Sequence, residues 1–164
     1  MILFLAAGLV QLAAQDRASL LKQQLESNKV TFDYTCTTLD KVPVTQTGKV
    51  VVDGNCYVIR GSGLEIWCDG KTRWTVDNEA SEVYIENSGG TRDFLANPAG
   101  YLDNVKDLQV SGTSASGTFT APGQDTAISF KFTSIKTSTL SGSSEGYSFD
   151  TTALGSEWII TDLR

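Results

Sequence analysis

The chain has 164 residues, of which 40% are hydrophobic and 20% charged, and this balance is typical of one globular domain. A formal net charge of −6, with 13 scattered basic residues, argues against a nucleic-acid surface, because phosphate contacts need clustered Lys and Arg. Histidine is absent, which removes the commonest general base and the commonest metal ligand.

The sequence favours a protein without catalytic chemistry. A serine nucleophile would need a lysine base in the absence of histidine, and no spacing in the chain supports one. The spacing of Cys36, Cys56 and Cys68 matches no zinc pattern. We therefore expect no catalytic residues, no metal site and no cofactor.

The N-terminal segment, residues 1–14, has the hydrophobic run and small residues of a signal peptide. It is too short to span a bilayer. We expect cleavage near Ala14 or Gln15, which makes the mature chain an exported protein with one domain over residues 15–164. The alternative is that this segment forms a buried N-terminal helix or strand.

Residues Asp16 to Asn28 are predicted to form an amphipathic helix. Leu20, Leu21 and Leu25 recur at helical spacing among polar residues, and Asp16 suits the N-cap. The period then changes to two. Val30, Phe32, Tyr34 and Cys36 alternate with polar residues, which is typical of a half-buried strand.

Turn signals follow at short intervals, with runs rich in Val, Ile, Tyr, Trp and Thr between them. Strands joined by such tight turns predict an antiparallel meander. The turns are expected at Lys41–Pro43, Asp53–Asn55, Gly61–Gly63, Asp69–Lys71 and Asp77–Asn78.

The register of one hairpin follows from a two-residue loop at Gly61 and Ser62, which pairs Tyr57 with Ile66 and Ile59 with Leu64. Carrying the pairing through the neighbouring turns separates an apolar face from a mixed one. Cys56 and Cys68 then point to opposite faces and are not bonded, whereas a three-residue turn centred on Ser62 would place them opposite each other. The apolar face holds Val51, Tyr57, Ile59, Leu64, Ile66, Cys68, Trp74 and Val76, and the mixed face holds Val50, Val52, Cys56, Val58, Arg60, Glu65, Trp67, Arg73 and Thr75.

The segment from Asn87 to Asn104 interrupts the strands. Asn97 and Pro98 suit a helix start, so one short helix or helical turn is expected there. Further strands are expected near Asp107–Val110, Gly117–Thr120, Ala127–Ile135, Gly146–Thr151 and Trp158–Leu163.

These elements predict a mainly β (α+β) fold: an antiparallel curved sheet of about ten strands that forms an incomplete barrel, with an N-terminal helix on its concave side and a short helical insert as lid. Two short helices cannot cover a sheet of that size with full packing. The architecture therefore favours a residual apolar hollow.

Several motifs resemble those of the outer-membrane lipoprotein carrier proteins. The central one runs Asp69-Gly70-Lys71-Thr72-Arg73-Trp74 and leads through Val76 and Asp77 into the strand at Glu82. Its order and spacing agree with an alternating aromatic first strand at Val30 and Tyr34, with Gly48-Lys49-Val50 opening the second strand, and with the insert and closing strand at Asn97-Pro98, Tyr101-Leu102, Phe149, Gly155 and Trp158–Leu163.

The resemblance implies a periplasmic monomer that carries lipoprotein acyl chains, or similar lipids, in a hydrophobic cavity from an inner-membrane donor complex to an outer-membrane acceptor. Well-studied members latch the lid with an arginine near the turn before the third strand, where this sequence has Asp53. The implied cavity lining is Phe32, Tyr34, Tyr57, Ile59, Leu64, Ile66, Trp74 and Val76, and the implied lid residues are Phe94, Leu95, Tyr101 and Leu102.

Each assignment has an alternative at this point. The apolar lining could be plain core, and the insert could be a helix docked permanently on the sheet. A second function is an envelope domain that senses a lipid or a protein on the same fold without carrying it, because fold alone does not separate a carrier from a sensor.

Overall fold

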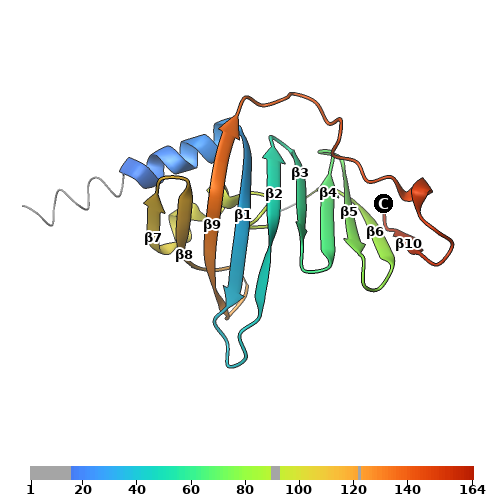
Figure 1. Ribbon diagram of the computed structural model, residues 1–164, viewed down its shortest axis with the longest axis horizontal. Helices are drawn as coiled ribbons and strands as arrows, with labels where there is room; N and C mark the ends of the chain where they lie inside the picture. The colour runs from blue at the N-terminus through green and yellow to red at the C-terminus, as the bar shows by residue number, and fades with distance from the viewer. Residues whose placement is uncertain (1–15, 90–92, 122) are drawn as a thin grey trace, which may run out of the picture.

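A ten-stranded sheet organises the chain in the computed structural model, which describes residues 16–89, 93–121 and 123–164 (Figure 1). The predicted signal peptide lies outside these residues. Within them, no helix is long and apolar enough to cross a membrane. The strands are β1 (Lys29–Thr38), β2 (Thr45–Asp53), β3 (Cys56–Gly61), β4 (Leu64–Cys68), β5 (Thr72–Asp77), β6 (Glu82–Asn87), β7 (Lys106–Ser111), β8 (Ser114–Thr120), β9 (Ala127–Ser138) and β10 (Ile159–Asp162).

The strand order across the sheet is β10-β6-β5-β4-β3-β2-β1-β9-β8-β7, so β1 to β6 form the predicted meander (Figure 1). The mainly β class is confirmed. The sheet is mixed, however, because β10 pairs in parallel with β6, and the expectation of a wholly antiparallel sheet is wrong there. The sheet is also open, with β10 and β7 at its two edges.

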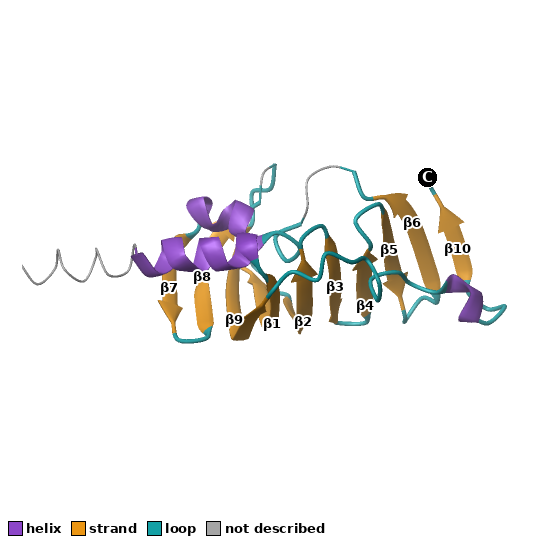
Figure 2. Cartoon of the chain, turned by 90° about the horizontal axis from the view of Figure 1, so that it is seen from above, coloured by secondary structure: helices purple, strands orange, loops and turns teal. Residues whose placement is uncertain are grey.

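The N-terminal helix and the helical insert before β7 lie on one face of the sheet, which we call the inner face (Figure 2). The predicted N-terminal helix is confirmed over residues 16–27, and Leu21 and Leu25 pack against the sheet. Leu20 belongs to the predicted stripe but is 57% exposed. The predicted insert is a 3-10 helix, η1 (Pro98–Asn104), and Asp103 of η1 forms an ion pair with Lys22 of the first helix.

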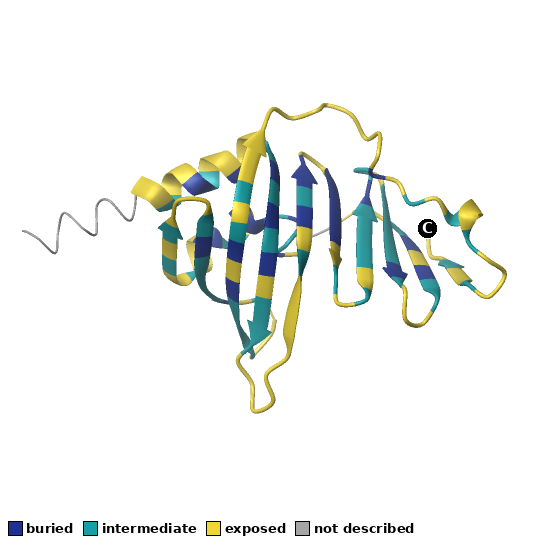
Figure 3. Cartoon of the chain, in the orientation of Figure 1, coloured by how far each residue is buried: buried dark blue, intermediate teal, exposed yellow. Residues whose placement is uncertain are grey.

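The alternation of buried and exposed residues along β1 and β9 marks the inner face (Figure 3). The β3–β4 hairpin turns through Ser62 and Gly63, which both have positive φ, of 53° and 78°. Ile59 therefore pairs with Ile66, and Tyr57 with Cys68, two residues from the predicted register. A shift of two residues preserves the faces. Cys56 and Cys68 lie on opposite faces and form no disulfide bond with each other, as predicted.

The faces predicted for β2 and β5, which lie across the turns at Gly54 and Gly70, are wrong. Asp53 pairs with Cys56 and Cys68 pairs with Arg73, and each pairing differs by one residue from the assumed register. A slip of one residue moves every side chain to the other face. The inner face therefore holds Val50, Val52, Arg73 and Thr75, whereas Val51, Trp74 and Val76 lie on the opposite, outer face with Trp67.

The connection between β9 and β10, residues 139–158, packs on part of the outer face, and we call it the strap. Gly146–Thr151, predicted as a strand, belongs to it and forms no strand; its end enters the short 3-10 helix η2 (Thr151–Ala153). The strap packs its aromatic side chains on the sheet without pairing with a strand. Tyr147 contacts the cluster of Cys56 and Val58, and Phe149, Leu154 and Trp158 pack on Trp67, Trp74, Val76, Val83 and Ile85.

Candidate functional site

The inner face contains an apolar hollow of about 210 Å³ between the sheet and the segment that leads into η1. We call it the inner hollow. It brings together Tyr34, Ile59, Leu64 and Ile66 of the predicted cavity lining with Phe94 and Leu95 of the predicted lid. Sequence reasoning missed its other lining residues, which are Cys36, Gln46, Gly61, Asp93, Phe119 and Ile128.

The remaining predicted residues lie elsewhere. Phe32 and Tyr57 are buried on the inner face outside this hollow. Trp74 and Val76 are on the outer face under the strap, so the assignment of these two to a cavity on the face of Tyr57 is corrected. Leu102 is part of the inner core, and Tyr101 packs against Phe94 and Phe119.

Two glycines shape the sheet side of the inner hollow. The Tyr34 ring lies over them: a Cβ on Gly48 would stand 2.8 Å from Tyr34 Cε1, and one on Gly61 would stand 2.8 Å from the Tyr34 hydroxyl. A Cβ at Gly61 would also approach the Thr47 carbonyl oxygen to 2.1 Å. The strands come close only because both positions lack a side chain, and the aromatic ring covers the exposed backbone.

Replacing Gly61 by Ala should therefore destabilise the protein by about 1–3 kcal/mol or more, because backbone and Tyr34 must move to admit the methyl group. Gly89 is the matched control, since a Cβ there meets nothing within 4 Å. Urea unfolding of both variants measures the difference. Equal stability of Gly61→Ala and Gly89→Ala would contradict the close packing of β2 and β3.

The wall of the inner hollow is electrically neutral around its centre. Burial raises the pKa of the Cys36 thiol to about 11, so this thiol stays protonated at neutral pH. Burial also raises the pKa of the Tyr34 hydroxyl above its ordinary value. Asp93 contributes the carboxylate of the lining, and its side chain is largely exposed at the rim. An interior of this kind suits a hydrocarbon chain better than a charged ligand.

Phe94 closes one side of the inner hollow and is itself anchored in an aromatic cluster. Its ring centroid lies 4.0 Å from that of Phe119, 4.9 Å from Phe130 and 5.4 Å from Phe132. Its side chain is buried. In this structure the segment is docked on the sheet.

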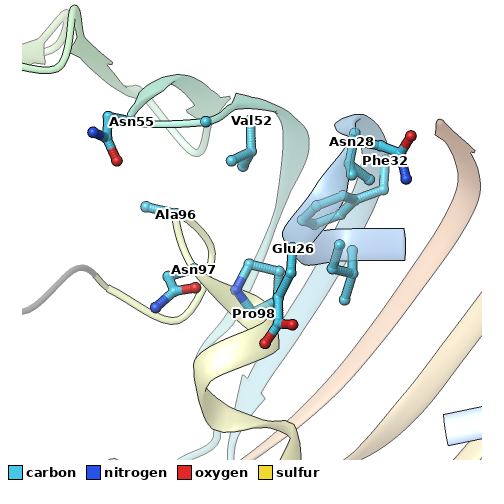
Figure 4. A pocket seen from close by; sticks show the side chains of 11 residues that line it. Glu26, Asn28, Phe32, Val52, Asn55, Ala96, Asn97 and Pro98 are labelled. Atoms are coloured by element: carbon cyan, nitrogen blue, oxygen red, sulfur yellow. The ribbon is translucent and has the colours of Figure 1, made fainter. Parts of the chain in front are cut away.

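A second hollow of about 220 Å³ lies next to the start of η1 (Figure 4). Phe32 and Val52 from the sheet, Ala96 and Pro98 from the insert, and Glu26 from the first helix surround it. Phe94 and Leu95 line the inner hollow, and Ala96 lines the second one. Residues 94–96 thus stand between two spaces that both border the inner face of the sheet.

Asp53 occupies the region of the expected latch arginine, but it holds the strap. Its side chain is buried and accepts hydrogen bonds from Ser141 N at 3.0 Å, Ser141 Oγ at 2.6 Å and the Tyr147 hydroxyl at 2.9 Å. Lys29 Nζ lies 3.6 Å away. Burial alone would raise the pKa of Asp53, but these hydrogen bonds and the Lys29 charge lower it below its ordinary value.

The described residues offer no other chemical centre of a familiar kind. They contain no group of three or more His, Cys, Asp or Glu that could hold a metal ion. Gly142-Ser143-Ser144-Glu145-Gly146 has the spelling Gly-x-Ser-x-Gly, but it lies in the exposed strap and not at a turn from strand to helix, where a nucleophile elbow needs to be.

No protein-family model matches the chain, and a comparison with curated proteins finds no significant match. The resemblance to lipoprotein carriers therefore rests on the motifs of the sequence itself.

Proposed function

We propose that this protein binds an acyl chain in the inner hollow and releases it unchanged to an acceptor. The observation that carries the proposal is the apolar space between the inner face of the sheet and the segment 93–95, with Asp93 at its rim. Burial of each methylene group contributes about 0.8 kcal/mol. A few buried methylenes give useful affinity, yet the ligand remains transferable.

The volume of the inner hollow determines how many methylene groups of an acyl chain it can hold while residues 94–96 stay docked on the sheet. Its volume of about 210 Å³ is roughly seven times the ~30 Å³ that one water molecule occupies in the liquid. A methylene group is of similar size, so part of one acyl chain fits. A longer chain needs residues 94–96 to move away, which would join the inner hollow to the second one.

The lid role of Phe94, Leu95, Tyr101 and Leu102 is part of this proposal. When no ligand is bound, Phe94 and its neighbours occupy the place of the acyl chain. An incoming acyl chain then displaces these side chains. Periplasmic transport of lipoproteins between an inner-membrane donor and an outer-membrane acceptor, by a monomeric carrier after signal-peptide cleavage, is the biological setting that the sequence motifs favour. The rival, a sensor on the same fold, would bind the same ligand but co-purify with one signalling protein.

Ile59→Trp tests the proposal. Ile59 lines the inner hollow, so an indole side chain there should fill the space and abolish binding of a fluorescent fatty acid while the protein stays folded. Val58 is the matched control, since it is equally buried but lies on the outer face under Tyr147. Val58→Trp should overpack and destabilise by about 1–3 kcal/mol without changing fatty-acid binding per folded molecule.

Fluorescence titration and thermal melting of the two variants give the answer together. A large loss of melting temperature in Ile59→Trp, with unchanged binding per folded molecule, would assign Ile59 to a packed core and reject the cavity.

A further inference from the structure

Arg73 lies on the inner face beside the rim of the inner hollow. It pairs with Cys68 across β4 and β5. This pair lies two residues along the strands from the pair of Ile66 and Thr75, and Ile66 lines the hollow. Its Nη2 donates to the Asp93 carboxylate at 3.2 Å, and Asp93 lines the inner hollow directly before Phe94. This ion pair therefore connects the sheet to the beginning of the segment that closes the hollow.

The guanidinium of Arg73 is incompletely satisfied. Its Nε is buried and has no hydrogen-bond partner, although buried polar groups are nearly always paired. The Asp93 side chain, its ion-pair partner, is 57% exposed, and an ion pair of this exposure is weak. A guanidinium offers two parallel donors to a planar carboxylate, whereas here Asp93 uses one nitrogen.

The described residues that line the inner hollow include no lysine or arginine. The ion pair with Asp93 brings the guanidinium of Arg73 to the rim of the hollow. The net charge of −6 makes capture of an anion by the surface as a whole unfavourable. Arg73 is the cation that the contact with Asp93 places beside this rim.

We propose that Arg73 binds the carboxylate head of a single-chain acyl ligand, such as a free fatty acid, whose tail lies in the inner hollow. The Asp93 carboxylate holds this position when the hollow is empty, and the ligand carboxylate replaces it with a bidentate contact that satisfies Nε. The loss of the Arg73–Asp93 pair frees residues 93–97 from β5. This inference rests on the proposed binding of acyl chains and narrows the ligand to chains with a free carboxylate, which the ester- and amide-linked chains of lipoproteins lack.

The test compares two fluorescent probes with the same hydrocarbon chain, one ending in a carboxylate and the other in a primary alcohol. Either variant loses the ion pair and frees the segment, which changes the affinity for both probes, so the readout is the ratio of the two affinities. For Arg73→Gln we expect the affinity for the acid to fall about tenfold relative to that for the alcohol, from loss of a charge-assisted contact. Asp93→Asn removes the internal competitor, so its affinity for the acid should rise several-fold relative to that for the alcohol.

Arg73→Lys keeps the charge without the paired donors and should fall between the wild type and Arg73→Gln for the acid. Asp93 is exposed, so Asp93→Asn should fold even if Arg73→Gln does not. In that case the acid and alcohol affinities of Asp93→Asn alone test the inference. Weaker binding of the acid relative to the alcohol by Asp93→Asn would overturn this inference. So would equal effects of each substitution on both probes, because the ion pair would then only hold the segment on the sheet. Failure of the wild type to bind either probe would instead reject the proposed function.

Discussion

Phe94→Ala should lower the free energy of unfolding by about 3–5 kcal/mol, because it removes the ring at the centre of the cluster formed with Phe119, Phe130 and Phe132. If the ring also closes the inner hollow, its removal enlarges that space. The variant should then bind a fluorescent fatty acid more tightly, and should accept a longer chain, although it is less stable.

Phe149→Ala is the matched control for Phe94→Ala. Phe149 packs on the outer face against Trp67, with ring centroids 6.0 Å apart, and does not border the inner hollow. It should lose stability without a change in acyl binding. Chemical unfolding and probe titration measure the two effects separately, and Phe94→Leu provides a milder variant. Weaker acyl binding by Phe94→Leu would mean that the ring supports the site and does not close it.

Asp53→Asn has the second-largest expected effect, a loss of about 2–4 kcal/mol with release of the strap. The buried carboxylate receives hydrogen bonds from Ser141 and Tyr147 and the charge of Lys29, and hydrogen bonds to charged groups contribute about 1.5–3 kcal/mol. Limited proteolysis should cleave the variant within residues 139–146. The control is Asp33→Asn, whose exposed ion pair with Lys49 at 3.8 Å should matter little.

The stability contribution of Asp53 also has a defined pH dependence. The pKa of its carboxyl is lower in the folded chain than its ordinary value of 3.8, so the folded state binds a proton less readily than the unfolded state. The contribution is therefore complete above pH 3.8 and decreases as the pH falls through the lowered pKa of the folded state. The stability difference between wild type and Asp53→Asn should shrink below pH 4. A constant difference down to pH 2 would show that Asp53 stabilises the strap without its charge.

The sequence predicts the elements of this fold well where one periodicity dominates. The helix at residues 16–27, the strand β1 and the 3-10 helix after Asn97 all follow from local patterns. The faces of β3 and β4 are also predicted correctly, because Ser62 and Gly63 form a turn that preserves the period of two.

The faces of Val51, Trp74 and Val76 could not be obtained in the same way. They depend on how many residues each turn contains, and Gly54-Asn55 and Gly70-Lys71 permit turns of different length. In the turn before β5, the Asp69 carboxylate accepts backbone N–H groups of Lys71 and Thr72, a local bond that only the folded geometry shows.

The strap and the rim of the inner hollow depend on contacts across long sequence distances. Tyr147 reaches Asp53 over 94 positions, and Arg73 reaches Asp93 over 20 positions. Alternation in a single segment contains no information about such partners. Phe119 and Ile128 could have been assigned to the lining from their alternating strands, had the pairing of β8 and β9 with β1 been known.

Photo-crosslinking tests the central claim most directly. A fatty acid with a diazirine in its chain is bound to the wild-type protein, irradiated, and located by peptide mass spectrometry, with excess unlabelled fatty acid as competitor. We predict saturable crosslinks in peptides that contain Tyr34–Cys36, Ile59–Ile66 and Phe94–Leu95, which line the inner hollow, and their loss in Ile59→Trp. Crosslinks that do not saturate, or that fall on the outer face around Val83, Ile85 and Phe149, would contradict binding of an acyl chain at this site.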